Sequence, residues 1–308
     1  MEQGICDLYV GNVVDSENGL SATDIRHILT PQELAIKPKT NSDSAYAANR
    51  KVDSATVFDS ADITMGIYDV DAKTQAFLLN ESQPSEGGVV ESAEDEADYK
   101  CVFYKTNLRR KKTATTRVTR YGWIYKIQFQ PWDTSLKTLE GKPVLSSGAP
   151  SLTGSAQATD YSYENEKGQT IHPWRWYVDD DDPNCPADIA DTWAQYLHVP
   201  GADKTVPTVT TVPADEATAV AETSSVVWTF SKTIAQSKVN AGNFVVLKAS
   251  DGSAVAGILA VDSTGKIVTF KPAENLAAGA YIAIVSKNVT DTFGIALAGN
   301  TVINFTVA

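Results

Sequence analysis

The alternation of apolar and polar residues is clearest between Tyr121 and Gln130, where almost every second side chain is large and apolar. One side of an extended chain carries Tyr121, Trp123, Tyr125, Ile127 and Phe129. The other side carries Gly122, Ile124, Lys126, Gln128 and Gln130 and is polar apart from Ile124. Successive side chains of a β-strand point to opposite faces. The pattern therefore predicts a half-buried strand with an uncommitted polar face, ended by Pro131.

Other stretches predict a mainly β-structured first half with one helix. Residues 7–14, 61–70 and 99–108 have the composition or alternation of strands. Residues 71–80, DAKTQAFLLN, predict a short helix, because Asp69 or Asp71 can cap its start, Asn80 suits its exit and the apolar residues form a stripe. A strand that leads directly into an amphipathic helix indicates a sheet with a helix packed on it.

Two segments show no regular period. Residues 31–60 are polar and small, which indicates either a surface loop or an arm that becomes ordered against a neighbouring subunit. Residues 82–98 are acidic and contain Glu94, Asp95 and Glu96. Calcium loops alternate their ligands around a glycine at a fixed position, and this run does not, so we expect a solvated loop.

Positive charge gathers at one place, where Arg109, Arg110, Lys111 and Lys112 follow one predicted strand and precede the next. We interpret these residues as the tip of a hairpin. Such a tip is usually solvated, and it lacks the flanking aromatic residues with which nucleic-acid sites stack bases. The remaining possibility is docking to an acidic surface of another copy of the chain.

Length and charge narrow the class of protein. A chain of 308 residues favours about two domains. The net charge is −12, and the first 200 residues hold 19 Lys and Arg against 30 Asp and Glu. Such acidity repels nucleic acid. Apolar runs fall short of a membrane span, and the start lacks signal-peptide features, which favours a cytosolic origin. The three cysteines, Cys6, Cys101 and Cys185, suit free thiols.

Residues 160–198 contain the segment HPWRWYVDDDDPNC. Trp174 and Trp176 lie two positions apart, so packing on one face of a strand is favoured over a carbohydrate site. The run from Asp179 to Asp182 is interpreted as a solvated turn rather than a calcium site, and residues 188–198 as a closing helix. His27, His172 and His198 have no second ligand at metal spacing. Together with the lack of any catalytic motif, these observations predict no enzyme, metal or cofactor.

The residues also support a resemblance. The strand and helix in ADITMGIYDVDAKTQAFLL, the hairpin ending in YGWIYKIQFQP and the segment KTLEGKPVLSSGAPSLTGSAQA resemble the major tail protein of long, flexible-tailed bacteriophages. The match covers residues 55–160 best. It implies a tail-tube β-sandwich or barrel with one flanking helix, and six copies in a ring, with rings stacked into a tube. It implies assembly in the host bacterial cytoplasm and a place in the virion tail.

The resemblance also implies which partners the chain meets and which of its surfaces touch neighbouring copies. Negative charge would let DNA pass through the tube without specific binding, and the other partners would be tape-measure and tail-terminator proteins. A closed ring of identical subunits needs two different complementary patches, and the basic tip against Glu94, Asp95 and Glu96 is a candidate pair. The polar strand face would meet the lumen or a neighbour. Candidate stacking residues in the arm are Lys37, Asn41, Tyr46, Arg50, Val57 and Phe58.

The last third of the chain differs from the rest. Residues 199–213 hold three prolines, and short β-rich runs separated by turn signals follow. The phrases VVWTFSKTI, VTFKPAENLAAGAYIAIVS and INFTV resemble the bacterial immunoglobulin-like (Ig-like) module of exported proteins. We predict a tail-tube domain at 1–198, a linker at 199–207 and an Ig-like β-sandwich at 208–308.

Two other functions stay open. The Ig-like domain would project outward and aid weak adhesion to cells, with host surface glycans as its ligands. That domain alone would equally suit a secreted or surface-layer binding protein, against which the missing signal peptide argues. A tube subunit of a phage-tail-like bacteriocin is a variant of the first interpretation.

Overall fold

The computed structural model describes residues 2–47, 50–68, 70–110, 117–131 and 151–308, with backbone alone for 2–3, 43–47 and 50–55. The chain forms two compact units, Met1–Gly201 and Ala202–Ala308, and their boundary falls inside the predicted linker. Each unit is described by itself. Most of the regular structure is strand, which confirms the predicted mainly β fold class of a β-sandwich followed by an Ig-like sandwich.

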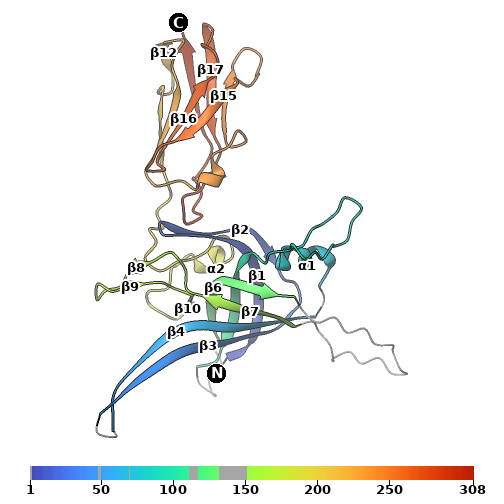
Figure 1. Ribbon diagram of the computed structural model, residues 1–308. Coiled ribbons are helices and arrows are strands. Elements are labelled where there is room, and N and C mark those ends of the chain that lie inside the picture. The colour runs from blue at the N-terminus through green and yellow to red at the C-terminus, as the bar shows by residue number, and fades with distance from the viewer. Residues whose placement is uncertain (1, 48–49, 69, 111–116, 132–150) are drawn as a thin grey trace. The chain divides into compact units, whose positions relative to one another are not determined.

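The first unit is built on an eight-stranded antiparallel sheet (Figure 1). Seven strands follow the order β2-β1-β5-β6-β7-β4-β3, and β10 pairs with β6 beside β7. Strands from both halves of this order share one apolar core, so the sheet curls around it. Their bounds are β1 Glu2–Ser16, β2 Gly19–His27, β3 Pro31–Ala47, β4 Arg50–Ile67, β5 Tyr99–Leu108, β6 Val118–Gln130, β7 Ser151–Gln157 and β10 Arg175–Asp179.

The predicted helix is confirmed as α1, Ala72–Leu79. Asp71 caps it by accepting a hydrogen bond from the Thr74 backbone N–H at 2.6 Å. Asn80 ends it in the left-handed conformation that a helix exit uses, at φ 58°. Phe77 and Leu78 are buried in the core of the sheet, so α1 covers the core-facing side.

The segment predicted to lack a period is a long hairpin. β3 and β4 pair from Pro31 with Ile67 to Ala47 with Arg50, and their far end projects beyond the rest of the sheet in Figure 1. The prediction of an irregular loop is wrong for a physical reason. The described side chains of the projecting part lie in solvent on both faces, so no alternation of apolar and polar residues was required there. We call residues 37–60 the arm.

β6 departs from the predicted half-buried strand. In its first half both faces are buried: Gly122, Trp123 and Ile124 are all enclosed. Ile124 lies in the core of the sheet. Trp123 donates its indole N–H to the Trp193 carbonyl at 2.9 Å, so the segment after α2 (Ile189–Thr192) covers that face. Alternation with exposed polar residues holds only from Lys126 to Gln130.

Residues 160–198 are compact but contain little regular structure. β8 (Tyr163–Glu164) and β9 (Thr170–Ile171) pair, and β10 follows. Trp174 precedes β10 and stacks on Phe58 of the arm, whereas Trp176 stacks on Trp123, so the two tryptophans pack in different places. The predicted closing helix is shorter than expected, because α2 holds four residues.

The second unit is a sandwich of two four-stranded sheets. Their orders are β11-β13-β16-β15 and β12-β18-β17-β14. Trp228, Phe244 and Tyr281 are buried between them. Gly252 and Gly265 lie in turns between its strands and adopt φ of 71° and 67°, which glycine tolerates best. The strands are β11 Val209–Val212, β12 Ala217–Val220, β13 Val226–Phe230, β14 Phe244–Lys248, β15 Gly257–Val261, β16 Ile267–Pro272, β17 Gly279–Val285 and β18 Thr301–Val307; one 3-10 turn spans Gln236–Lys238.

Candidate functional site

The most distinctive polar site of the first unit lies on one face of β10. Arg175, Tyr177 and Asp179 alternate along this strand and therefore point the same way. Opposite them on β6 are Ile124, Gly122 and Arg120, in that register. The Arg120 guanidinium lies 4.3 Å from the Tyr177 ring centroid and that of Arg175 lies 4.9 Å from it, so the ring is flanked by two cations.

Gly122 makes room for the next part of the site. A Cβ atom at this position would come within 2.2 Å of the Tyr104 ring, so that ring lies directly over the backbone of β6. From there the Tyr104 hydroxyl accepts hydrogen bonds from Nε and Nη2 of Arg175. A residue with no side chain on β6 thus lets a tyrosine of β5 orient an arginine of β10.

Two aspartates bind the other arginines. Arg120 Nε donates to Asp179 at 2.7 Å, and Arg110 Nη2 donates to both Asp179 and Asp181 at 2.6 Å. The hydrogen bond from Arg120 is the main cause that lowers the pKa of Asp179. The hydrogen bonds that Arg110 donates to Asp181 and Asp179 raise the pKa of Arg110. The expected solvated turn is therefore partly an ion-pair network that joins the β5–β6 hairpin to β10.

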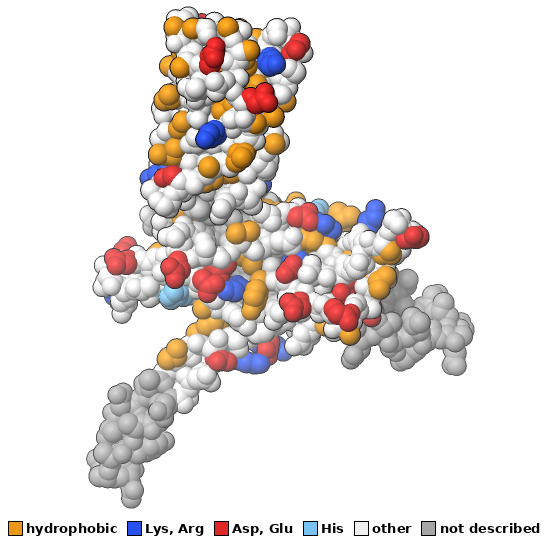
Figure 2. Space-filling view, turned by 45° about the horizontal axis from the view of Figure 1, so that its top comes forward, with side chains coloured by type: hydrophobic (Ala, Val, Ile, Leu, Met, Phe, Trp, Pro, Cys, Tyr) orange, Lys and Arg blue, Asp and Glu red, His pale blue; other side chains and the backbone are white. Residues whose placement is uncertain are grey.

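Arg175 differs from its neighbours, because no carboxylate binds it among the residues that the structure describes. The site holds three arginines, and Asp179 and Asp181 bind two of them, Arg110 and Arg120. In the view of Figure 2, acidic side chains are spread over the first unit. Arg175, which no described carboxylate binds, therefore suits an anionic group.

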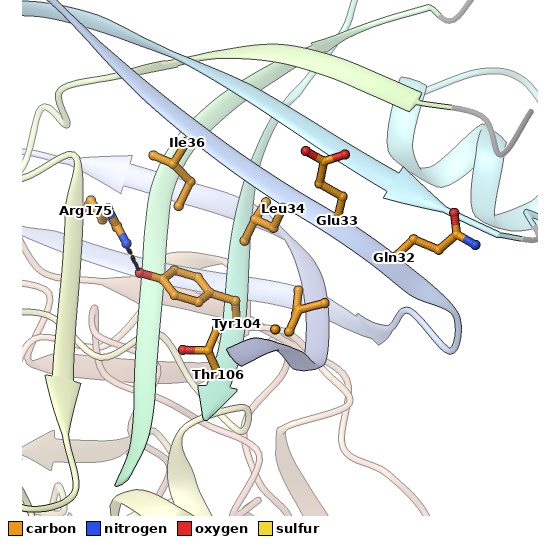
Figure 3. A pocket seen from close by; sticks show the side chains of 9 residues that line it. Gln32, Glu33, Leu34, Ile36, Tyr104, Thr106 and Arg175 are labelled. Carbon is orange, nitrogen blue, oxygen red and sulfur yellow. Dashed lines mark hydrogen bonds between the residues drawn. The ribbon is translucent and has the colours of Figure 1, made fainter. Parts of the chain in front are cut away.

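A cavity of about 230 Å³ opens next to Arg175 (Figure 3). Leu34 and Ile36 of β3 form an apolar wall, and Tyr104 and Thr106 of β5 lie opposite. The Thr106 hydroxyl oxygen is buried and has no hydrogen-bond partner among the described residues. A second hollow of about 210 Å³ continues past Arg175 to Arg120 and Tyr177. We call the first cavity the Arg175 socket.

The predicted arm residues are only partly available for contacts. Lys37 and Asn41 are exposed, and Val57 is 65% exposed. Phe58 is half-buried instead, because its ring stacks on Trp174 at 4.8 Å. Tyr46 and Arg50 belong to β3 and β4, but their side chains lie outside the described residues.

The predicted basic tip contains one residue that is bound within its own chain. Arg110 forms the ion pairs with Asp179 and Asp181, so its charge is already partly compensated. Arg109 is half-buried, and Lys111 and Lys112 lie outside the described residues. Of the expected acidic partners, Glu94 and Glu96 are exposed and Asp95 is half-buried.

The predicted polar face of β6 is also partly occupied from within. Lys126 Nζ lies 3.0 Å from Asp15 and 2.9 Å from Asp160. Burial opposes its charged form, but these hydrogen bonds outweigh burial and raise the pKa of Lys126. Gln128 donates to the Ala97 carbonyl at 2.8 Å, and Gln130 is exposed. This leaves Gln128 and Gln130 as the exposed part of that face.

Sequence reasoning missed Arg120 and Arg175 because neither belongs to a motif. Arg175 lies between Trp174 and Trp176, and Arg120 immediately precedes the aromatic strand that begins at Tyr121. The alternation of Arg175, Tyr177 and Asp179 was a usable signal, since it predicts a shared face. The pairing of β10 with β6 was not readable, because it joins residues more than fifty positions apart.

Metal-ligating side chains and thiols are the remaining chemically active groups of the described residues. It holds no group of three or more metal-ligating side chains. The cysteines are free thiols, and burial raises the pKa of Cys101 to about 12, which keeps that thiol protonated and unreactive. Among the described residues no helix is long and apolar enough to cross a membrane.

Comparison with known proteins bears on the second unit. Its two facing sheets define an Ig-like β-sandwich. Residues 203–307 match the family model of the bacterial Ig-like domain. No curated protein sequence matches the chain.

Solved structures add little to this result. Two of them are the N-terminal part of the bacterial S-layer protein SbsC and the S-layer protein rSbsC(31-844). Both are 19% identical with a TM-score of 0.27 over 33% of this chain, so they support no argument about function. The match spans 24% of the first structure and 14% of the second.

Proposed function

We propose that the chain is a structural subunit that assembles with copies of itself into stacked rings, as the tail-tube resemblance implies. The observation that carries this proposal is the arm. From Thr40 to Ala47 it extends over roughly 24 Å as two strands, and the described side chains at 40–42, 56 and 57 are exposed. A two-stranded hairpin is marginally stable in water. A partner that covers the arm would stabilise it.

The remaining features agree with this role. The first unit is a curled β-sheet with one flanking helix, as the tail-tube resemblance implies. Its excess of acidic residues suits a tube that passes DNA without binding it. Within this proposal six copies form each ring, tape-measure and tail-terminator proteins are the other partners, and the tail of the virion is the site of action. The function is structural and not enzymatic.

Excision of the outer arm tests the proposal. Replacement of residues 42–56 by Asn-Gly, a dipeptide that favours tight hairpin turns, keeps the pair of Asn41 with Val57 and the stack of Phe58 on Trp174. We expect a folded chain that gives single rings or monomers, whereas the full chain gives tubes in negative-stain electron microscopy. Tubes of ordinary length from the shortened chain would contradict the role of the arm. Strictly monomeric full chain at high concentration would contradict the proposed function.

A second candidate is a secreted or surface-layer binding protein. The match of residues 203–307 to the bacterial Ig-like family favours it, because such a domain can act as a binding module. Cosedimentation of the full chain with bacterial cells and with isolated cell-wall glycans separates the two functions. Saturable binding by a chain that never assembles would favour the second candidate.

A further inference from the structure

We propose that the Arg175 socket receives a carboxylate from the acidic loop, residues 90–96, of a second copy of this chain. This inference rests on the proposed self-assembly and names two surfaces that would meet in it. In this inference Arg175, rather than the basic hairpin tip, is the cation that meets the acidic loop. Arg110 of that tip is already bound by two aspartates, whereas Arg175 lacks a carboxylate partner among the described residues.

The polar groups of the socket suit a carboxylate. Nη1 of Arg175 makes no hydrogen bond to a described residue, because its described bonds run from Nε and Nη2 to Tyr104. The Thr106 hydroxyl also borders this cavity and is buried without a hydrogen-bond partner among the described residues. A carboxylate offers two acceptor oxygens and forms charge-assisted hydrogen bonds with a guanidinium. Glu33 also borders the cavity, but Figure 3 shows its carboxylate turned away from Arg175.

The lining of the socket indicates what kind of group it receives. Its volume of about 230 Å³ is continued by the second hollow of about 210 Å³, so the space accommodates a side chain. Leu34 and Ile36 line one wall, so the occupant should combine an aliphatic group with the carboxylate. A short acidic segment with an exposed valine or leucine meets both requirements.

The acidic loop has this composition. Val90 is 49% exposed, and the exposed Glu91 and Glu94 follow it. The Val90 backbone N–H donates to the Ser82 carbonyl at 2.9 Å, which closes the loop and reduces the entropy lost on docking. In the other acidic run, Asp179 and Asp181 are already bound by Arg110 and Arg120 beside the socket itself.

The two surfaces lie on different elements of one unit. The socket is formed by β3, β5 and β10, and the loop follows α1, which lies apart from β10 in Figure 1. Contact between different patches of identical chains is heterologous, and such contacts close into rings or continue as filaments. The proposed contact therefore provides a lateral bond of the kind that a ring requires.

Peptide binding tests the contact directly. A peptide of residues 81–98 is titrated by calorimetry onto the full chain, kept below the concentration at which it assembles. We expect a dissociation constant of about 0.1–1 mM, which is weak because one short segment buries little surface. Arg175→Gln should weaken binding at least tenfold, and a peptide with Gln at positions 91, 94 and 96 should weaken it equally. Tyr104→Phe, which frees Arg175 without removing its charge, should have a smaller effect.

Lys105→Gln is the matched control. Like Arg175→Gln, it removes one positive charge. Lys105 of β5, however, points away from the socket, toward the rings of Tyr121 and Trp193. Binding that is absent, or that Arg175→Gln and Lys105→Gln reduce alike, would overturn the inference. Circular dichroism and thermal unfolding identify variants that fail to fold. If Arg175→Gln fails to fold, Arg175→Lys takes its place, because it retains the charge but loses the bidentate geometry.

The outcome for assembly is separate. Peptide binding that depends on Arg175 in a chain that never forms rings would support the contact and contradict the proposed function. Ring formation unaffected by Arg175→Gln would support the proposed function and contradict the contact.

Discussion

At the scale of single residues, the neighbours of a side chain decide its role more than its type does. Lys126 lies on a strand face that is polar in sequence, yet its ammonium group is held by Asp15 and Asp160 of the same chain. Gly122 occupies a neutral position in the pattern, yet the Tyr104 ring lies over it. Both residues position other groups and are unavailable for contacts with a partner.

Gly122→Ala should destabilise the first unit by about 1–3 kcal/mol, because the added methyl group overpacks the Tyr104 ring. Movement of that ring also releases Arg175 from the Tyr104 hydroxyl. Urea unfolding followed by tryptophan fluorescence measures the change. Gly66→Ala is the control, since its Cβ would meet its nearest atom at an ordinary 3.4 Å. Equal losses from the two substitutions would contradict the argument.

At the scale of elements, the ion-pair network links a hairpin to a strand that follows it by some fifty residues. Asp179, the last residue of β10, is bound by Arg120 of β6 and by Arg110, which follows β5. These bonds fix the end of β10 to the β5–β6 hairpin. The arm is the opposite case. Its base is held by the stack of Phe58 on Trp174, and the described part beyond it is solvated.

Asp179→Asn should cost about 1–2 kcal/mol near neutral pH, less than a fully buried pair because Arg110 is half-exposed. The folded-state pKa of Asp179 is lowered. The free energy of unfolding that Asp179 contributes is therefore fully present above its unfolded-state pKa of about 3.9. It is lost as the pH falls through the lower folded-state pKa.

Unfolding of both proteins between pH 7 and pH 2 measures this effect. The difference between wild type and Asp179→Asn should stay constant down to about pH 5 and shrink below about pH 4. Asp180→Asn is the control, because that exposed carboxylate has no described ion pair. A difference that persists at pH 2 would show that Asp179 acts through packing rather than charge.

At the scale of the whole molecule, the chain joins two units with separate cores. The boundary has a physical basis in the first unit. Tyr125 donates its hydroxyl to the His198 carbonyl at 2.9 Å, and Tyr161 donates to the Pro200 carbonyl at 3.2 Å. The segment up to Pro200 therefore belongs to the first unit, although a linker was predicted from 199.

A chain that ends at Gly201 should keep these bonds, fold and assemble like the full chain, if the Ig-like unit is an appendage. A chain that ends at Tyr196 is the informative comparison. It loses His198 and Val199, which are buried, and should be less stable by several kcal/mol. Electron microscopy and thermal unfolding measure both effects. If a folded chain 1–201 fails to assemble, the Ig-like unit takes part in the contacts between copies that build the tube.

The sequence by itself determined the local features of this protein. The helix after Asp71 with its exit at Asn80, the bounds of β5 and the strands of the Ig-like unit follow from short-range pattern, because caps, turns and alternation act within a few residues. Only the tertiary structure decided the pairing of β10 with β6, the hairpin form of the arm and the hydrogen bonds of Arg175 to Tyr104. These features depend on contacts between distant residues, and no local period encodes them when a strand is solvated or buried on both faces.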